Sequence, residues 1–131
     1  MKEDMRKELV KMRKALKKPE KERVIPLIEI IEGMIDDRFV LNVQSVCAMS
    51  DILKSIASET ENAKVHRAIV NILILFVKNM ESFKHSGALI PIKTQLCLDR
   101  TMVALDIFIA NLIDKVGGQC YGYSKKWEIY R

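Results

Sequence analysis

Apolar side chains recur at steps of three and four residues through almost the whole chain, and no segment shows the sustained alternation of a half-buried strand. This spacing places apolar side chains on one face of a helix, because an α-helix repeats every 3.6 residues. We therefore predict an all-α protein, folded as a single compact bundle of about five helices in one domain, 1–131. The domain has a basic amphipathic helix at 1–18, a helical core at 24–118 and an aromatic, basic tail at 119–131.

Prolines, glycines and capping residues set the expected helix limits. Pro19 is expected to end the first helix, and Pro26 is favourable only in a first turn, so it is expected to open the second. Asp36 and Asp37 are predicted caps of the third helix, and Ser58 to Glu61 has the spacing of a capping box for the fourth. The expected second to fifth helices then span 26–35, 39–57, 60–83 and 92–116, the last ending at Gly117-Gly118.

The fourth predicted helix is apolar around most of its circumference, with its polar positions reduced mainly to Arg67, Asn71, Lys78 and Glu81. A helix of this kind is usually surrounded by neighbours on several sides. We therefore expect it at the centre of the bundle.

The net charge of +5 is carried by one end of the chain, because residues 1–23 hold ten Lys and Arg against five Asp and Glu. In the first helix, Met5, Leu9, Met12 and Leu16 form one narrow apolar stripe, and basic side chains occupy the other faces. Three interpretations are open. The stripe docks on the bundle or on a second copy while the lysines are solvated, the basic side chains neutralise nucleic-acid phosphates, or the helix lies on an anionic membrane surface.

The fifth predicted helix has one apolar face broad enough to dock on a core and a second apolar stripe on its far side. This second stripe consists of Leu96, Val103, Ile107 and Ala110. Either the first helix or the tail covers it within the chain, or it binds a protein partner or a second copy, since exposed apolar patches commonly mark interfaces.

The tail holds all three tyrosines and the single tryptophan of the chain, interleaved with basic residues. If the tail is helical, Tyr123, Trp127 and Tyr130 share one face. Such aromatic side chains dock on their own domain, anchor protein interfaces or stack on nucleic-acid bases, and the sequence leaves these three alternatives open.

Candidate chemistry is sparse. The possible metal ligands, Cys47, Cys97, Cys120, His66 and His85, show no close pairing, so we predict no metal site and no cofactor. The cysteines are expected to be reduced and mostly buried, which favours a cytoplasmic or nuclear location, and the histidines are expected to be solvated. No nucleophile with a base, no phosphate-binding glycine loop and no small-molecule substrate is predicted.

We therefore expect a non-enzymatic module for protein interaction, as an adaptor or in assembly, that binds a protein partner or itself. The alternative is an accessory protein that binds nucleic acid, in particular RNA; a membrane surface is a weaker third possibility. The residues predicted to contact a protein partner are Leu96, Val103, Ile107, Tyr123, Trp127 and Tyr130. The residues predicted to contact nucleic acid are Arg6, Lys7, Lys11, Arg13, Lys14, Lys17, Lys18, Lys125 and Lys126.

Overall fold

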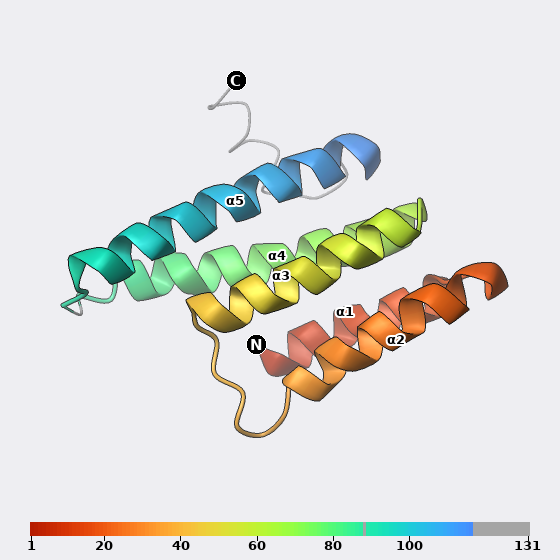
Figure 1. Cartoon of the computed structure of the whole chain (residues 1–131), viewed down its shortest axis with the longest axis horizontal. Helices are drawn as coiled ribbons and strands as arrows, with labels where there is room; N and C mark the ends of the chain where they lie inside the picture. The colour runs from red at the N-terminus through yellow and green to blue at the C-terminus, as the bar shows by residue number, and fades with distance from the viewer. Residues whose placement is uncertain (88, 117–131) are drawn as a thin grey trace.

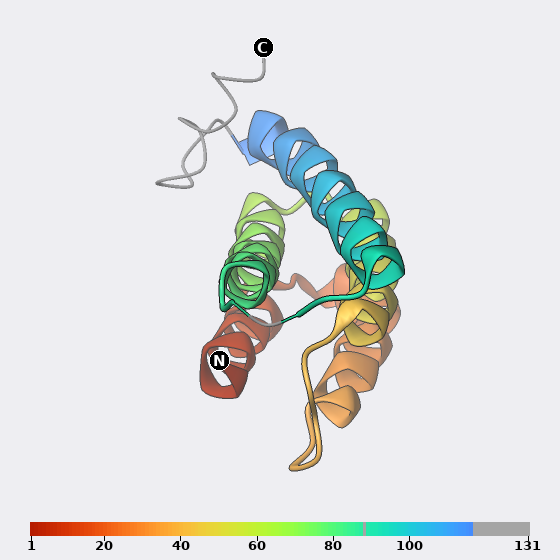
Figure 2. The same ribbon diagram turned by 90° about the vertical axis from the view of Figure 1, so that its left-hand side faces the viewer.

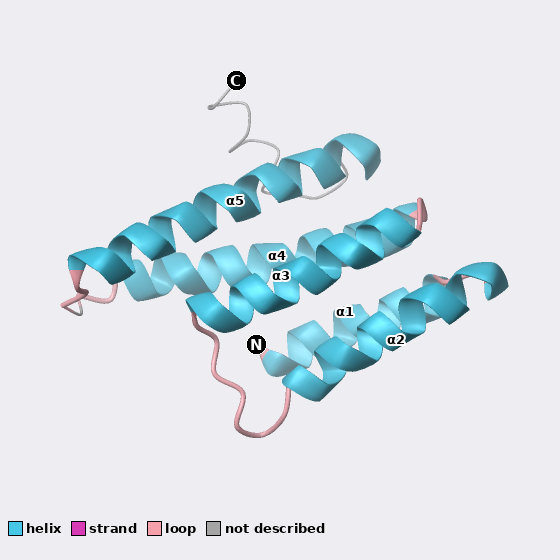
Figure 3. Ribbon diagram, in the orientation of Figure 1, coloured by secondary structure: helices cyan, strands magenta, loops and turns pink. Residues whose placement is uncertain are grey.

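The computed structural model describes residues 1–87 and 89–116, and every regular element in these ranges is a helix (Figure 3). This confirms the all-α class and the bundle. The elements are α1 (Lys2–Ala15), α2 (Lys18–Met34), α3 (Val43–Glu59), α4 (Ala63–Lys84) and α5 (Ile92–Val116). The predicted tail, with Tyr123, Lys125, Lys126, Trp127 and Tyr130, lies outside the described residues.

The helices lie roughly along one direction in three tiers, with α1 and α2 in the first, α3 and α4 in the second and α5 in the third (Figure 1). Viewed from one end, α1 and α4 form one side of the bundle, α2 and α3 form the other, and α5 lies across the top (Figure 2). Helix α4 packs against α1, α3 and α5. Its central position, predicted from its composition, is confirmed by ten buried side chains.

The apolar stripe of α1 is part of the core. Met5, Leu9 and Met12 are completely buried, and the helix packs against α4 and α2. Of the three interpretations of this helix, the first is therefore correct for its apolar side: the stripe docks on the bundle within the chain.

The second helix begins earlier than predicted. Pro19 lies in the first turn of α2, where a missing N–H has no consequence, and the chain turns at Leu16 and Lys17 instead. Pro26, the predicted start, lies inside α2. Without an N–H, Pro26 cannot donate to the carbonyl of Glu22, and both residues lie on the exposed side of the helix. The prediction was wrong because the buried apolar face of α2 continues on both sides of the proline.

The predicted caps of the third and fourth helices were also wrong. Asn42 caps α3, its side chain accepting from the Ser45 N–H at 2.9 Å while the Ser45 hydroxyl accepts from the Asn42 N–H. Asp36 and Asp37 lie in the loop before this cap. Asn62 caps α4 by accepting from the Lys64 N–H at 3.0 Å, and Ser58 belongs to α3. Several side chains near these ends are able to cap, and the packing of the helices selects between them.

Candidate interaction surfaces

The second stripe of α5 is exposed. Leu96, Val103 and Ile107 have 53%, 58% and 53% of their surface accessible, and Ile92, one turn before Leu96, has 77%. The opposite face of the same helix supplies Leu105, Ile109 and Leu112 to the core. The first helix, one of the two predicted covers, packs on α4 and α2 instead, and the tail lies outside the described residues.

An apolar groove opens at the end of the bundle where α3 begins, α4 ends and α5 begins. It encloses about 500 Å³. The residues that line it are Val40, Leu41, Asn42, Val43, Gln44, Asn79, Met80, Phe83, Thr94 and Leu98. Val40 and Phe83 are themselves exposed, and so are Leu89, just before α5, and Ile92, its first residue. Thr94 and Leu98 line the groove from the core side of α5, whereas Ile92 lies on the opposite side with the stripe.

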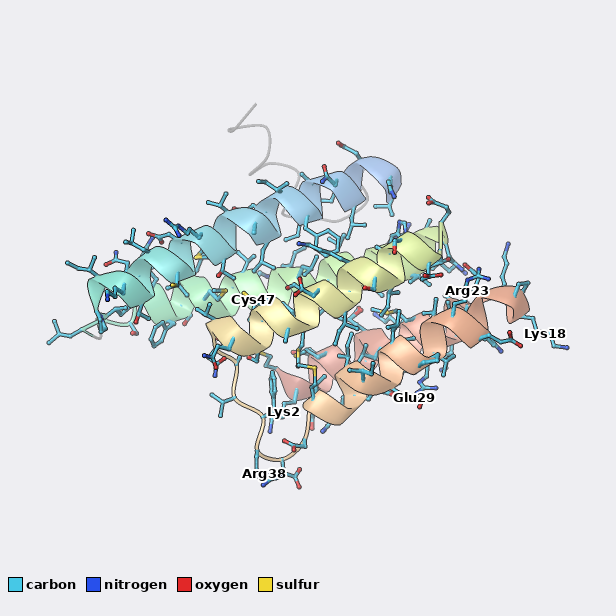
Figure 4. The ribbon with its side chains drawn as sticks, viewed as in Figure 1. Lys2, Lys18, Arg23, Glu29, Arg38 and Cys47 are labelled. Atoms are coloured by element: carbon cyan, nitrogen blue, oxygen red, sulfur yellow. The ribbon has the colours of Figure 1, made fainter. Side chains whose placement is uncertain are left out.

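Two of the predicted nucleic-acid contacts have structural roles. Arg6 donates to the carbonyl of Ile35 at 2.6 Å, beside Lys2, which donates to the carbonyls of Asp36 and Asp37 (Figure 4 labels Lys2). These bonds hold the carbonyls of Ile35, the C-cap of α2, and of the loop that follows it. Arg13 pairs with Glu32 of α2 at 2.5 Å. Its hydrogen bond to Glu32 raises the pKa of Arg13 above the ordinary value, so the guanidinium stays charged.

The other basic residues of this region lie on the surface. Lys7, Lys14, Lys17 and Lys18 are exposed and have no carboxylate partner among the described residues, while Lys11 pairs with Glu8 at 3.1 Å. Figure 4 shows Lys18 at the outer end of α2. Among the predicted nucleic-acid contacts, Arg13 and Lys11 are therefore paired with carboxylates, whereas Arg6 remains exposed.

A basic groove that the sequence did not predict lies between α1 and α4. It encloses about 400 Å³. Its basic side chains are Lys11 and Lys14 of α1 together with Lys64 and Arg67 of α4. Only the pairing of these two helices brings the four together, so no local pattern identifies the site. The one available signal in the sequence is spacing. Lys11 and Lys14 are three residues apart, as are Lys64 and Arg67, and residues at this spacing share a helix face.

The residues considered for metal binding are not assembled. Cys47 and Cys97 are exposed, not buried as predicted; both are free thiols. His66 is 1% exposed, not solvated as predicted, and its Nε2 lies 2.6 Å from the carbonyl of Thr60. A nitrogen this close to a carbonyl oxygen carries the proton and donates it. Within the described residues no three His, Cys, Asp or Glu side chains cluster as metal ligands.

No family model, no curated protein and no solved structure matches this chain. Among the described helices, none combines the length and the apolar character needed to cross a membrane.

Proposed function

We propose that the protein is a non-enzymatic interaction or assembly module that binds an amphipathic helix of a protein partner along the outer face of α5. The observation that carries this proposal is the exposure of Leu96, Val103 and Ile107, each more than half accessible, on a helix whose opposite face is already buried. Contiguous exposed apolar surface is uncommon on monomeric proteins and usually marks a binding site.

The surroundings of the stripe favour a helical partner. Its side chains follow one another along the helix axis, so a second helix lying beside α5 contacts all of them. Asp99, next to the stripe, pairs with Lys84 at 2.7 Å, and this pairing lowers the cost of covering its carboxylate. Ile92, which is also exposed, lengthens the same stripe by one turn.

The test compares Leu96→Lys/Val103→Lys with Val10→Lys/Ile30→Lys, a control that changes two exposed apolar residues on α1 and α2. Both variants are expected to fold, because the altered side chains are largely solvated. Proteins captured from the source cell by the full chain are quantified by mass spectrometry, and each is then bound in purified form. We expect a partner whose binding is lost only with the α5 variant. The proposal fails if capture is the same for both variants, or if no purified protein binds.

A second candidate function is nucleic-acid binding, and the observation that favours it is the exposure of Lys7, Lys14, Lys17 and Lys18 without carboxylate partners. Binding of this kind neutralises phosphates and weakens steeply with salt. The test titrates labelled RNA and DNA at increasing salt with the full chain and with Lys7→Glu/Lys18→Glu. Absence of binding at low salt, or binding that the variant leaves unchanged, removes this candidate.

We also propose an intracellular location. Cys47 and Cys97 are free and exposed thiols, a state that reducing compartments maintain. Detection of a disulfide at either cysteine in protein isolated from its source without reductant contradicts this placement.

A further inference from the structure

Basic side chains gather along the groove between α1 and α4, because the fold places these two helices side by side. Asn71 of α4 donates to Glu8 at 3.1 Å and Asn62 donates to the carbonyl of Ala15 at 2.7 Å, so the two helices run in opposite directions side by side. Figure 2 shows them as neighbours on one side of the bundle. This pairing sets Lys11 and Lys14 opposite Lys64 and Arg67.

The hollow exists because small side chains line it at the helix contact. Ala15 and Ala68 lie between the basic pairs, where longer side chains would fill the space. The resulting volume of about 400 Å³ is within the range of small-ligand sites. Four basic side chains therefore surround a hollow of the size that a small molecule occupies.

One carboxylate, that of Glu8, lines this groove, and hydrogen bonds fix its position. The Glu8 side chain is 9% exposed and accepts from both Lys11 and Asn71. It offsets the charge of Lys11, with which it pairs. Lys14 and Lys64 are exposed and have no carboxylate partner among the residues that the structure describes. Their ammonium groups are available to an anion.

The basic lining of this groove is short. One turn before Glu8, α1 carries the exposed acid Asp4, and one turn after Asn71, α4 carries the half-buried apolar side chains Ile74 and Leu75. The four basic residues thus extend over about one helical turn, on the order of 5 Å along the helix axes. A ligand that uses all of them is compact and carries several negative charges close together.

We infer that this groove is a binding site for a compact polyphosphate, a small molecule with two or three linked phosphate groups. Lysine ammonium groups and an arginine guanidinium are the usual partners of phosphate oxygens. The site is independent of the apolar face of α5, so this inference does not rest on the interaction proposed for that face. It shares Lys14 with the second candidate function, which also uses Lys7, Lys17 and Lys18, so the two are distinguished by the competition experiment below.

The test measures binding of inorganic tripolyphosphate to the full chain by calorimetry at about 50 mM salt, where charge interactions are weakly screened. We expect a dissociation constant below about 1 mM that rises with salt. Lys14→Glu/Lys64→Glu is expected to weaken binding at least about tenfold, because each reversal replaces attraction by repulsion. The matched control, Lys21→Glu/Lys93→Glu, makes the same change of charge at exposed lysines outside the groove and is expected to alter affinity by less than about threefold.

Glu8→Gln is expected to change the affinity for tripolyphosphate in the opposite direction. The glutamine keeps an oxygen for Asn71 and removes the negative charge from the groove, so tripolyphosphate is expected to bind about threefold more tightly or better. Circular dichroism melts of all variants verify that they are folded. The inference is overturned if tripolyphosphate does not bind, if the control weakens binding as much as the groove variant, or if Glu8→Gln has no effect.

A competition experiment separates a compact ligand from a polymer. Labelled single-stranded RNA is titrated with the full chain in the presence and absence of saturating tripolyphosphate. If RNA binds through Lys14 and Lys64 and tripolyphosphate fails to displace it, the groove is part of a nucleic-acid surface and the inference is wrong. Displacement of RNA by tripolyphosphate, or RNA binding that is unaffected by Lys14→Glu/Lys64→Glu, supports the compact site.

Discussion

Replacing Leu9 by alanine tests whether α1 belongs to the core, on which the position of every basic side chain of that helix depends. Leu9 is completely buried, and α1 packs against α4 and α2. Alanine is the best helix former, so the substitution does not weaken α1 itself. The whole loss of stability then comes from missing packing and from the space left behind.

The expected loss is about 2 to 5 kcal/mol, the range for removing a buried leucine side chain. With a loss of about 3 kcal/mol and a urea dependence of about 2 kcal/mol per M, the midpoint of unfolding falls by on the order of 1.5 M. Circular dichroism at 222 nm follows the transition, because helix content is the signal that all described elements share.

Val10→Ala is the matched control. Val10 is the next residue on the same helix and is 44% exposed, so it loses little packing and gains some helix propensity. We expect its free energy of unfolding to remain within about 0.5 kcal/mol of the parent. If Leu9→Ala and Val10→Ala differ by less than about 1 kcal/mol, α1 is not packed as described, and the groove between α1 and α4 loses its basis.

Four further substitutions are predicted to change stability, each measured by urea or thermal unfolding. Asn71→Ala removes the amide that donates to the buried carboxylate of Glu8 and is expected to lower the free energy of unfolding by about 1 to 3 kcal/mol. If the unpaired carboxylate causes this loss, Glu8→Gln/Asn71→Ala loses less stability than Asn71→Ala alone. Asn42→Ala removes the cap of α3 and is expected to cost about 1 kcal/mol, whereas no loss would show that the cap is dispensable. Gly33 lies within α2 with open space around it, and Gly87 has a φ of +80°. Gly33→Ala is therefore expected to stabilise by about 0.5 kcal/mol and Gly87→Ala to destabilise by about 1 kcal/mol, and equal effects would contradict this reasoning.

The sequence was most reliable where a structural property depends on neighbouring residues alone. The predicted limits of the fifth helix, 92–116, are those of α5. The two apolar faces of that helix and the single stripe of α1 were also identified correctly, because the helical repeat fixes which residues share a face. The exposure of Leu96, Val103 and Ile107 was left open by the sequence and is a result of the packing.

Predictions failed where several residues were able to serve the same purpose. Pro19 and Pro26 both suit a first turn, but only Pro19 occupies one in the structure. The residue types available as caps included Asp36, Asp37 and Asn42, and the last of these was selected. The buried length of each helix, set by its neighbours, decides between such alternatives.

The sequence by itself determined the class, the number of helices and the amphipathic faces, because these follow from a repeat of 3.6 residues and from local propensity. Only the tertiary structure decided what lies opposite each face. It buried His66 against the end of α3, used Arg6 and Arg13 to hold α1 to α2, and set Lys64 and Arg67 beside the lysines of α1. The contacts of Arg6, Arg13, Lys64 and Arg67 join residues distant along the chain, and the free energy that selects them comes from burying whole faces together, which no local pattern encodes.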